Sequence, residues 1–331
     1  MQRLILALLL LAACDDVDVE ASIDASIRVS FEDSGIVDAQ DAGAPVDAGM
    51  RLPRALDTER VWIPAGARYV NEPTLIRAHD GTWHMFSNGA EGRGNPWVEL
   101  QLLHATAPTL HGPWTDQPDI LTTRDADAVE SSLHAPFVLR DGDIYRIYYY
   151  DSTMPENEGL RTASSLDLFH WTRDREPIVG GRDAMILRHE GASYLYSVGT
   201  VLEADDEIHD IVRLQRAPAL RDWVPLAPAL RNPRACPDAC WGWYESPFVV
   251  ARDGGFYLFT TFTSSSTEDY ENTTVYFSRD PTHFSPEPVA TLHAHGGEVH
   301  EEGGALYLTH GGWPDKLTSK QPGLYVTRLA W

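Results

Sequence analysis

The sequence predicts an all-β fold, a five-bladed β-propeller whose blades are four-stranded antiparallel meanders. A short pattern recurs five times: a polar or charged residue, a hydrophobic run, a turn with glycine, and an aromatic-rich strand. The copies lie about 50 to 60 residues apart, which is the spacing of propeller blades. Asp-Gly or a similar pair between two β-rich runs predicts a hairpin in each copy.

Each copy contributes an inner strand, and further strands follow its hairpin. The inner strands are expected to begin at residues 71–75, 134–138, 182–186, 245–249 and 295–299. Third strands are expected near residues 100–105, 159–163, 211–215, 274–277 and 323–327. Outer segments often carry a tryptophan, and the outer segment of the fourth blade is expected near Phe284.

The fifth blade lacks an outer strand on its C-terminal side, because the chain ends at Trp331. Residues 60–63 can supply that strand and close the ring, which removes an unpaired sheet edge. The alternative is that residues 60–63 are the end of an N-terminal tether.

Residues 1–13 are predicted to be a lipoprotein signal peptide. A basic start precedes an apolar run over residues 4–11, which is too short to span a bilayer. The boundary Leu11-Ala12-Ala13-Cys14 resembles the bacterial lipobox, which implies cleavage before Cys14 and a lipid on its sulfur. We therefore expect a protein anchored in the bacterial cell envelope, periplasmic or on the cell surface. An ordinary signal peptide with a chance cysteine is the alternative.

Residues 14–55 are predicted to be a disordered acidic tether, since they are rich in Asp, Ala, Val and Gly and poor in aromatic residues. Much of the net charge of −23 lies in this part of the chain. Nucleic acid is thereby excluded as a partner, because phosphate binding needs clustered Lys and Arg. Residues 56–331 are predicted to form one propeller domain, and we expect a monomer.

Two cysteines, Cys236 and Cys240, lie close enough in sequence to pair. In an exported protein a disulfide is the favoured interpretation. Zinc is the alternative, but no second pair of ligands stands at zinc spacing. A disulfide here would stiffen the approach to Trp241 and Glu245.

Three of the five copies are expected to place a carboxyl group at the equivalent position: Glu72, Asp183 and Glu245. Equivalent positions of a radial array converge on its axis, so the three acids can meet in one cleft. Glycoside cleavage needs a carboxylic acid that is still protonated near neutral pH, and hydrophobic neighbours raise a carboxyl pKa. Aromatic residues flank Glu245 in sequence, which fits that requirement, although the same aromatic residues can simply form the core.

In their order and spacing these motifs resemble the five-bladed propellers of glycoside hydrolase family 43 and its relatives in family 32, over roughly residues 60–331. The motifs in question are Glu72-Pro73, Ala135-Pro136, Asp183, Glu245-Ser246-Pro247 and His295-Gly296. The resemblance implies that Glu245 is the general acid and Glu72 the general base. It also implies that Asp183 orients the substrate and raises the pKa of the general acid, Glu245.

The resemblance also suggests which residues surround the acids. Substrate-binding candidates are Arg182, His134, Trp241 and Trp243. The histidine of the fifth blade lies near a central ion in the family, often calcium, so His295 is a metal-neighbour candidate. No cofactor is expected to be required, and a structural calcium in the central channel is the one metal suggested.

The chain departs from the family pattern at Glu72, where the family has Asp. An inverting hydrolase needs about 6.5–9.5 Å between its two carboxyl groups so that a water fits beside the sugar. The extra methylene of Glu72 can preserve that gap or close it.

The sequence therefore predicts an exported, inverting glycoside hydrolase that acts on arabinofuranosyl or xylosyl linkages. The alternatives are a catalytically silent carbohydrate-binding propeller, a family 32-like fructosidase, and a structural surface propeller in which the three acids do not converge.

Overall fold

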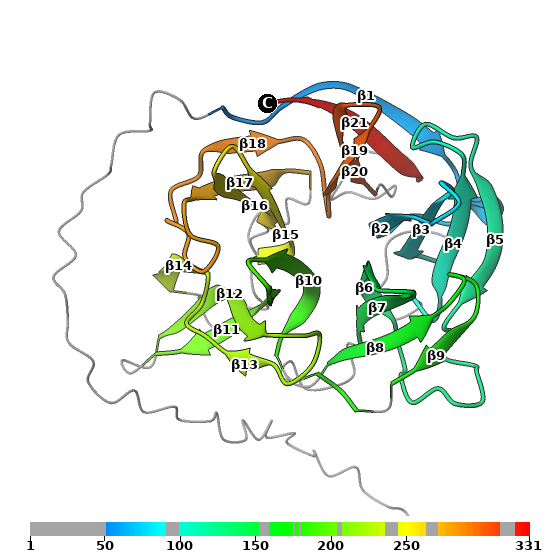
Figure 1. Ribbon diagram of the computed structural model, residues 1–331, viewed down its shortest axis with the longest axis horizontal. Helices are drawn as coiled ribbons and strands as arrows, with labels where there is room; N and C mark the ends of the chain where they lie inside the picture. The colour runs from blue at the N-terminus through cyan, green and yellow to red at the C-terminus, as the bar shows by residue number, and fades with distance from the viewer. Residues whose placement is uncertain are drawn as a thin grey trace, which may run out of the picture. The chain divides into compact units, whose positions relative to one another are not determined.

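A computed structural model gives the arrangement of the strands. The structure describes residues 51–90, 99–151, 159–174, 176–178, 180–203, 207–235, 244–262, 271–311 and 322–331. In these residues the chain forms twenty-one strands in five antiparallel sheets and one short 3-10 helix, η1 (Ala65–Ala67). The sheets are arranged around a common axis (Figure 1), so the predicted five-bladed propeller is confirmed.

Each blade is numbered by its place along the chain. Blade one consists of β2 (Asn71–Arg77), β3 (Trp83–Asn88), β4 (Leu102–Ala107) and β5 (Thr115–Ile120). Blade two consists of β6 (His134–Asp141), β7 (Ile144–Tyr150), β8 (Leu160–Ser165) and β9 (Trp171–Arg173). Blade three consists of β10 (Arg182–His189), β11 (Ala192–Leu202), β12 (Ile208–Ala217), β13 (Val224–Pro225) and β14 (Leu230–Ala235).

The last two blades complete the ring. Blade four consists of β15 (Tyr244–Arg252), β16 (Gly255–Phe262), β17 (Thr273–Ser278) and β18 (Ala290–Leu292). Blade five consists of β19 (Glu298–Glu302), β20 (Ala305–His310), β21 (Leu324–Ala330) and the N-terminal strand β1 (Arg54–Trp62).

Hairpins join the first two strands of each blade, and their turns use the residues predicted for them. Glu190 and Gly191 both have positive φ, 49° and 75°, as do Asp253 and Gly254 at 52° and 72°. Two successive positive φ values define the type I′ turn, whose twist matches that of the flanking strands. These short turns set the register of each inner strand, and hence the position of its first residues.

Blade five is closed by pairing of the first strand, β1, with the last strand, β21. β1 pairs with β21 in antiparallel register from Arg54 opposite Ala330 to Trp62 opposite Leu324. The hydroxyls of Thr58 and Thr327 are 2.8 Å apart across this pair, and Trp62 is buried. N-terminal closure is therefore confirmed, and the strand begins at Arg54 rather than at residue 60.

Two details of the outer strands differ from expectation. Blade four is completed by β18 rather than by a segment near Phe284, which is 1% exposed and packs in the core shared with blade three. The prediction was wrong because a buried aromatic residue in a loop gives the same sequence pattern as a residue in a strand. In blade three the outer edge is divided, since β13 and β14 pair with opposite halves of β12.

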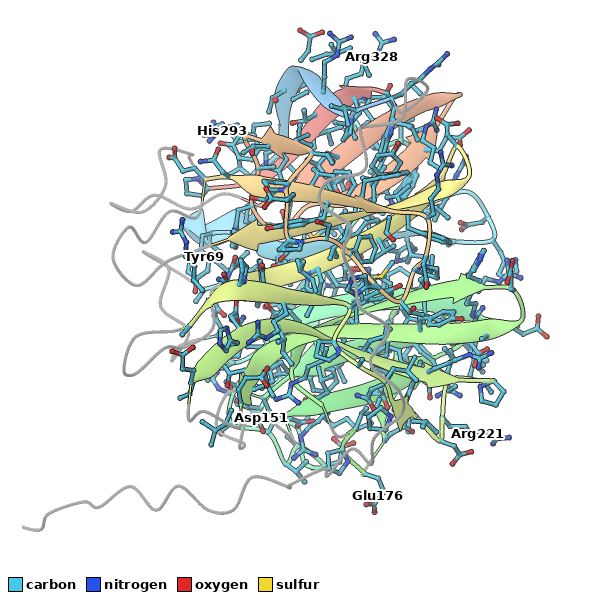
Figure 2. All side chains as sticks on the ribbon, turned by 90° about the vertical axis from the view of Figure 1, so that its left-hand side faces the viewer. Tyr69, Asp151, Glu176, Arg221, His293 and Arg328 are labelled. Atoms are coloured by element: carbon cyan, nitrogen blue, oxygen red, sulfur yellow. The ribbon has the colours of Figure 1, made fainter. Side chains whose placement is uncertain are left out.

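The face of the propeller where the inner strands begin is the one that positions the site. Figure 2 shows Tyr69 and His293, which precede the inner strands of blades one and five, on one side of the propeller. Arg221, which follows β12, lies toward the other side in the same view.

Several predictions fall on residues outside the described ranges. These are the signal peptide, Cys14, most of the tether, the Cys236–Cys240 pair, Trp241 and Trp243. The described residues belong to one compact unit, residues 45–331. Among them, no helix has both the length and the apolar character needed to cross a membrane.

Candidate active site

Two successive residues stand at or near the start of each inner strand, and the second of each pair lines a cavity on the axis. We call the first set the entry residues: Asn71, His134, Arg182, Glu245 and His295. We call the second set the bulge residues: Glu72, Ala135, Asp183, Ser246 and Gly296. Every bulge residue has positive φ, between 45° and 58°. In blades one to four a break in strand register follows the entry residue.

Positive φ is unfavourable for residues other than glycine, by roughly 1–2 kcal/mol each. Glu72, Ala135, Asp183 and Ser246 all adopt it at the same place in their blades. A bulge with this conformation redirects a side chain at the end of a strand. Backbone outliers of this kind cluster at functional sites, which points to the axis as the site.

The bulge positions correct one sequence expectation. Glu72 and Asp183 are equivalent, but Glu245 is an entry residue and Ser246 stands at the position of Glu72. The sequence contains evidence for the correct alignment of the two blades, because Pro73 and Pro247 align only when Glu72 is matched with Ser246. The three acids nevertheless converge, as their contacts show.

Arg182 connects two of the acids. Its Nη1 donates to Asp183 Oδ2 at 2.7 Å, and its Nη2 lies 3.6 Å from Glu245 Oε1. The same Nη2 donates to the carbonyl oxygen of Tyr244 at 3.1 Å, and the Tyr244 N–H donates to Asp210 at 2.6 Å. The backbone just before Glu245 is therefore held from blade three on both sides.

Ser246 connects the other pair. Its hydroxyl donates to Glu72 Oε1 at 2.7 Å, and its backbone N–H donates to Asp183 Oδ2 at 3.1 Å. Asp183 thus accepts bonds from Arg182 and from Ser246 and is 4% exposed at its side chain. Glu245 is more exposed, at 17% of its side chain, although aromatic residues flank it in sequence.

The site raises the pKa of two of its carboxyl groups. Burial raises the pKa of Glu245 to about 7, with the Arg182 guanidinium opposing the shift and Asp183 adding to it. Burial also raises the pKa of Glu72 well above its ordinary value, and the charges of Asp183 and Glu245 raise it further. The Ser246 hydroxyl and Arg182 act in the opposite direction on Glu72.

His134 stands at the start of β6 in blade two, and a buried acid holds its ring. Its Nδ1 is 2.5 Å from Glu99 Oε2, and Glu99 also accepts from Tyr69 at 2.5 Å and from Asn88 at 2.8 Å. Glu99 is 2% exposed. Sequence reasoning missed Glu99, Tyr69 and Asn88, because none of the three stands in a repeated motif.

A small cavity lies on the axis beside the bulge residues. Residues of all five blades line it, including Glu72, Asp183, Ser246 and Glu298. Its volume is about 30 Å³, which is room for about one water molecule. The cavity at this level is therefore too small for any ligand much larger than water.

The side chains that the structure describes bear on the calcium suggested near His295. His295 is 3% exposed, and no group of three or more His, Cys, Asp or Glu side chains among the described residues is arranged to hold a metal ion. Calcium also binds backbone carbonyl oxygens and water, so the calcium near His295 stays a prediction.

Comparison with known proteins gives matches of two kinds, while no protein-family model matches the chain. Two curated fungal proteins, probable arabinan endo-1,5-alpha-L-arabinosidase A of Aspergillus flavus and of Aspergillus oryzae, are each 30% identical over 146 residues. The match covers 40% of this chain and 42% of either relative. The chain thus spans about two fifths of the length of the curated relatives it matches.

Solved structures of similar fold include two from family 43 and one from family 32. A thermostable family-43 glycoside hydrolase has a TM-score of 0.59 and 16% identity, covering 80% of this chain and 89% of that one. A family 43 β-xylosidase/α-arabinofuranosidase from a compost metagenome has a TM-score of 0.54 and 15% identity, covering 84% and 94%. A family 32 β-fructofuranosidase of Bombyx mori has a TM-score of 0.54 and 16% identity, covering 79% and 62%. The fold is that of family 43-like propellers.

Proposed function

We propose that this protein is a glycoside hydrolase that cleaves arabinofuranosyl or xylosyl linkages of polysaccharides or oligosaccharides with inversion. One observation carries the proposal. Acids from blades one, three and four, distant in sequence, are linked at the axis through Arg182 and Ser246. This convergence favours a functional site over the purely structural propeller, for which the acids were expected to lie apart.

The chemistry follows from the environment of each acid. Burial raises the pKa of Glu245 to about 7, so its carboxyl group can donate a proton to the leaving oxygen near neutral pH. Glu72, when ionised, can accept a proton from the attacking water. Asp183 is held by Arg182 and the Ser246 amide, and its fixed position suits it to orient the sugar.

The names of the relatives support the choice of sugar. The Aspergillus proteins are named as arabinosidases, and the compost enzyme as a β-xylosidase/α-arabinofuranosidase. We therefore propose pentose-containing polymers as the substrate class. Purified protein should be assayed on aryl arabinofuranosides, aryl xylosides, arabinan, xylan and fructans. Release of pentose supports the proposal, and release of fructose would favour the family 32-like reading.

The stereochemical course tests the mechanism separately. Proton NMR of the first product formed shows which anomer is released. The opposite anomer to the substrate supports inversion, and the same anomer would indicate a covalent intermediate on an acid of the site.

A second candidate function has its own supporting observation. The raised pKa of Glu72 reduces the ionised fraction that a general base requires, so the site can bind sugar without turning it over. Under this reading the propeller is a carbohydrate-binding module. Calorimetric binding of arabino- or xylo-oligosaccharides without any hydrolysis would favour it.

The location of the protein is a further part of the proposal. The lipobox-like boundary at Cys14 supports export and attachment to the bacterial cell envelope through a lipid, with a carbohydrate substrate outside the cytoplasm. The proposed disulfide between Cys236 and Cys240 fits the same compartment.

A further inference from the structure

We propose that Ser246 is a positioning residue whose hydroxyl fixes the carboxyl group of Glu72 and whose amide fixes that of Asp183. Through these two bonds, one residue of blade four sets the positions of the acids of blades one and three. The inference rests on the proposed function, in which Glu72 accepts the proton of the attacking water.

The first argument is that the contact crosses the ring. Blade five stands between blades four and one, and its bulge residue is Gly296. A Cβ at Gly296 would lie 3.2 Å from both Cα and Cγ of Glu72 and 3.5 Å from Ser246 Oγ. The absence of a side chain at position 296 therefore leaves the space in which the hydroxyl and the glutamate meet.

The second argument is one of length. An aspartate at position 72 would withdraw the carboxyl group by about one C–C bond, roughly 1.5 Å. From 2.7 Å, such a withdrawal would take the oxygen out of hydrogen-bonding range of Ser246. Glu72 and Ser246 are thus a matched pair, and the serine accounts for the position that the longer acid adopts.

The third argument is electrostatic. Glu72 faces the acids Asp183 and Glu245 and the cation Arg182, and Glu298 of β19 lines the same cavity. Burial and two like charges favour the neutral form of Glu72, whereas the hydroxyl bond and Arg182 favour the charged form. Removing the hydroxyl should therefore raise the pKa of Glu72 and lower the fraction of Glu72 that is ionised at neutral pH.

The test compares the parent protein with Ser246→Ala. Alanine suits this backbone, because Ala135 holds the equivalent position in blade two with φ of 45°. The protonation of Glu72 is followed by carbon-13 NMR of protein labelled at its glutamate carboxyl groups, with Glu72→Gln identifying the signal. We expect the Glu72 titration to move to higher pH, and the acidic limb of kcat/KM to move with it.

The rates give a second readout. We expect Ser246→Ala to lower kcat/KM at pH 6 by about tenfold, the effect of losing a hydrogen bond to a charged group. In the Glu72→Asp background, where the bond is already broken, the same change should alter the rate less than twofold. A merely structural role for Ser246 would give the same loss in both backgrounds.

Ser278→Ala is the matched control. The Ser278 hydroxyl, also in blade four, accepts a hydrogen bond from the backbone N–H of Asp280 in a turn away from the axis. If Ser246→Ala does not fold, Ser246→Gly removes the same hydroxyl at a positive φ that glycine accepts readily.

The outcomes separate the two proposals. An unshifted Glu72 titration together with equal effects in both backgrounds overturns the role of Ser246, whatever the activity of the parent. A parent that hydrolyses no glycoside of the panel overturns the proposed function, even where the Glu72 titration shifts.

Discussion

The guanidinium of Arg182 lies between two acids, with Nη2 3.6 Å from Glu245 Oε1 while Nη1 bonds Asp183. Burial raises the pKa of Glu245, and the cation opposes that rise. The resulting pKa is about 7. If Glu245 donates the catalytic proton, its protonated form is the active one. This relationship fixes the sign of the pH dependence.

We expect kcat/KM to fall as the pH rises through about 7, because Glu245 then loses its proton. Arg182→Gln removes the positive charge that limits the rise in the pKa of Glu245. The alkaline limb of the pH–rate profile should therefore move to higher pH, while the maximal rate falls. The pH–rate profiles of the two proteins provide the check. Arg188→Gln, which breaks an ion pair with Asp141 on an exposed part of blade three, is the control and should leave the limb in place.

Glu245→Gln should abolish turnover of substrates with poor leaving groups. General acid catalysis contributes about 10²–10⁴-fold, and that loss should be visible on unactivated oligosaccharides. Aryl glycosides with an acidic phenol need little protonation, and their hydrolysis should persist. Equal losses on both kinds of substrate would speak against Glu245 as the acid.

Glu72→Gln should abolish turnover on every substrate, since the leaving group cannot replace the base that activates water. The expected loss is again about 10²–10⁴-fold. Glu72→Asp restores the residue that the family 43 pattern has here, and its rate shows what the longer side chain does. A higher rate would identify the parent as a weakened enzyme. If both proteins are inert yet bind sugar, the binding function is favoured.

Deleting the chain through Ile63 should destabilise the propeller strongly, whereas deletion through Met50 should cost little. The longer deletion removes all of β1, including buried Trp62 and the contact of Thr58 with Thr327. Loss of a buried tryptophan alone typically costs about 3–5 kcal/mol. Thermal unfolding of the two truncated proteins measures the difference, and equal Tm values would contradict a stabilising role for the closure.

Cys14→Ser should release the protein from membranes if a lipid on Cys14 is the anchor. Partitioning between detergent and aqueous phases, with the parent protein alongside, provides the measurement. Unchanged recovery in the detergent phase would show that attachment depends on something other than Cys14.

Repetition is the reason that so much of the fold could be predicted from sequence. The Gly-bearing turns and aromatic strands recur in every blade, so hairpins, blade number and the convergence of Glu72, Asp183 and Glu245 all followed. The segments that do not recur from blade to blade were predicted least accurately. The loop around Phe284 and the divided edge of blade three depend on packing between blades, which local pattern does not encode.

The electrostatics of the site could be predicted only in part. Aromatic neighbours indicated a raised pKa for Glu245, and the structure agrees in direction. The burial of Glu72 was not foreseen, because its bond to Ser246 joins residues 174 positions apart in sequence. Contacts between blades of this kind depend on ring geometry and backbone conformation, which no short motif displays.

The closure of blade five has a consequence for the order in which the molecule forms. Thr58 and Thr327, which meet across β1 and β21, are separated by 269 positions, nearly the whole length of the propeller. Contacts between residues so distant in sequence slow folding. A ribosome-bound chain can assemble its early blades in turn, but the first strand it makes must wait for the last. Completion of the ring therefore follows the synthesis of all five blades.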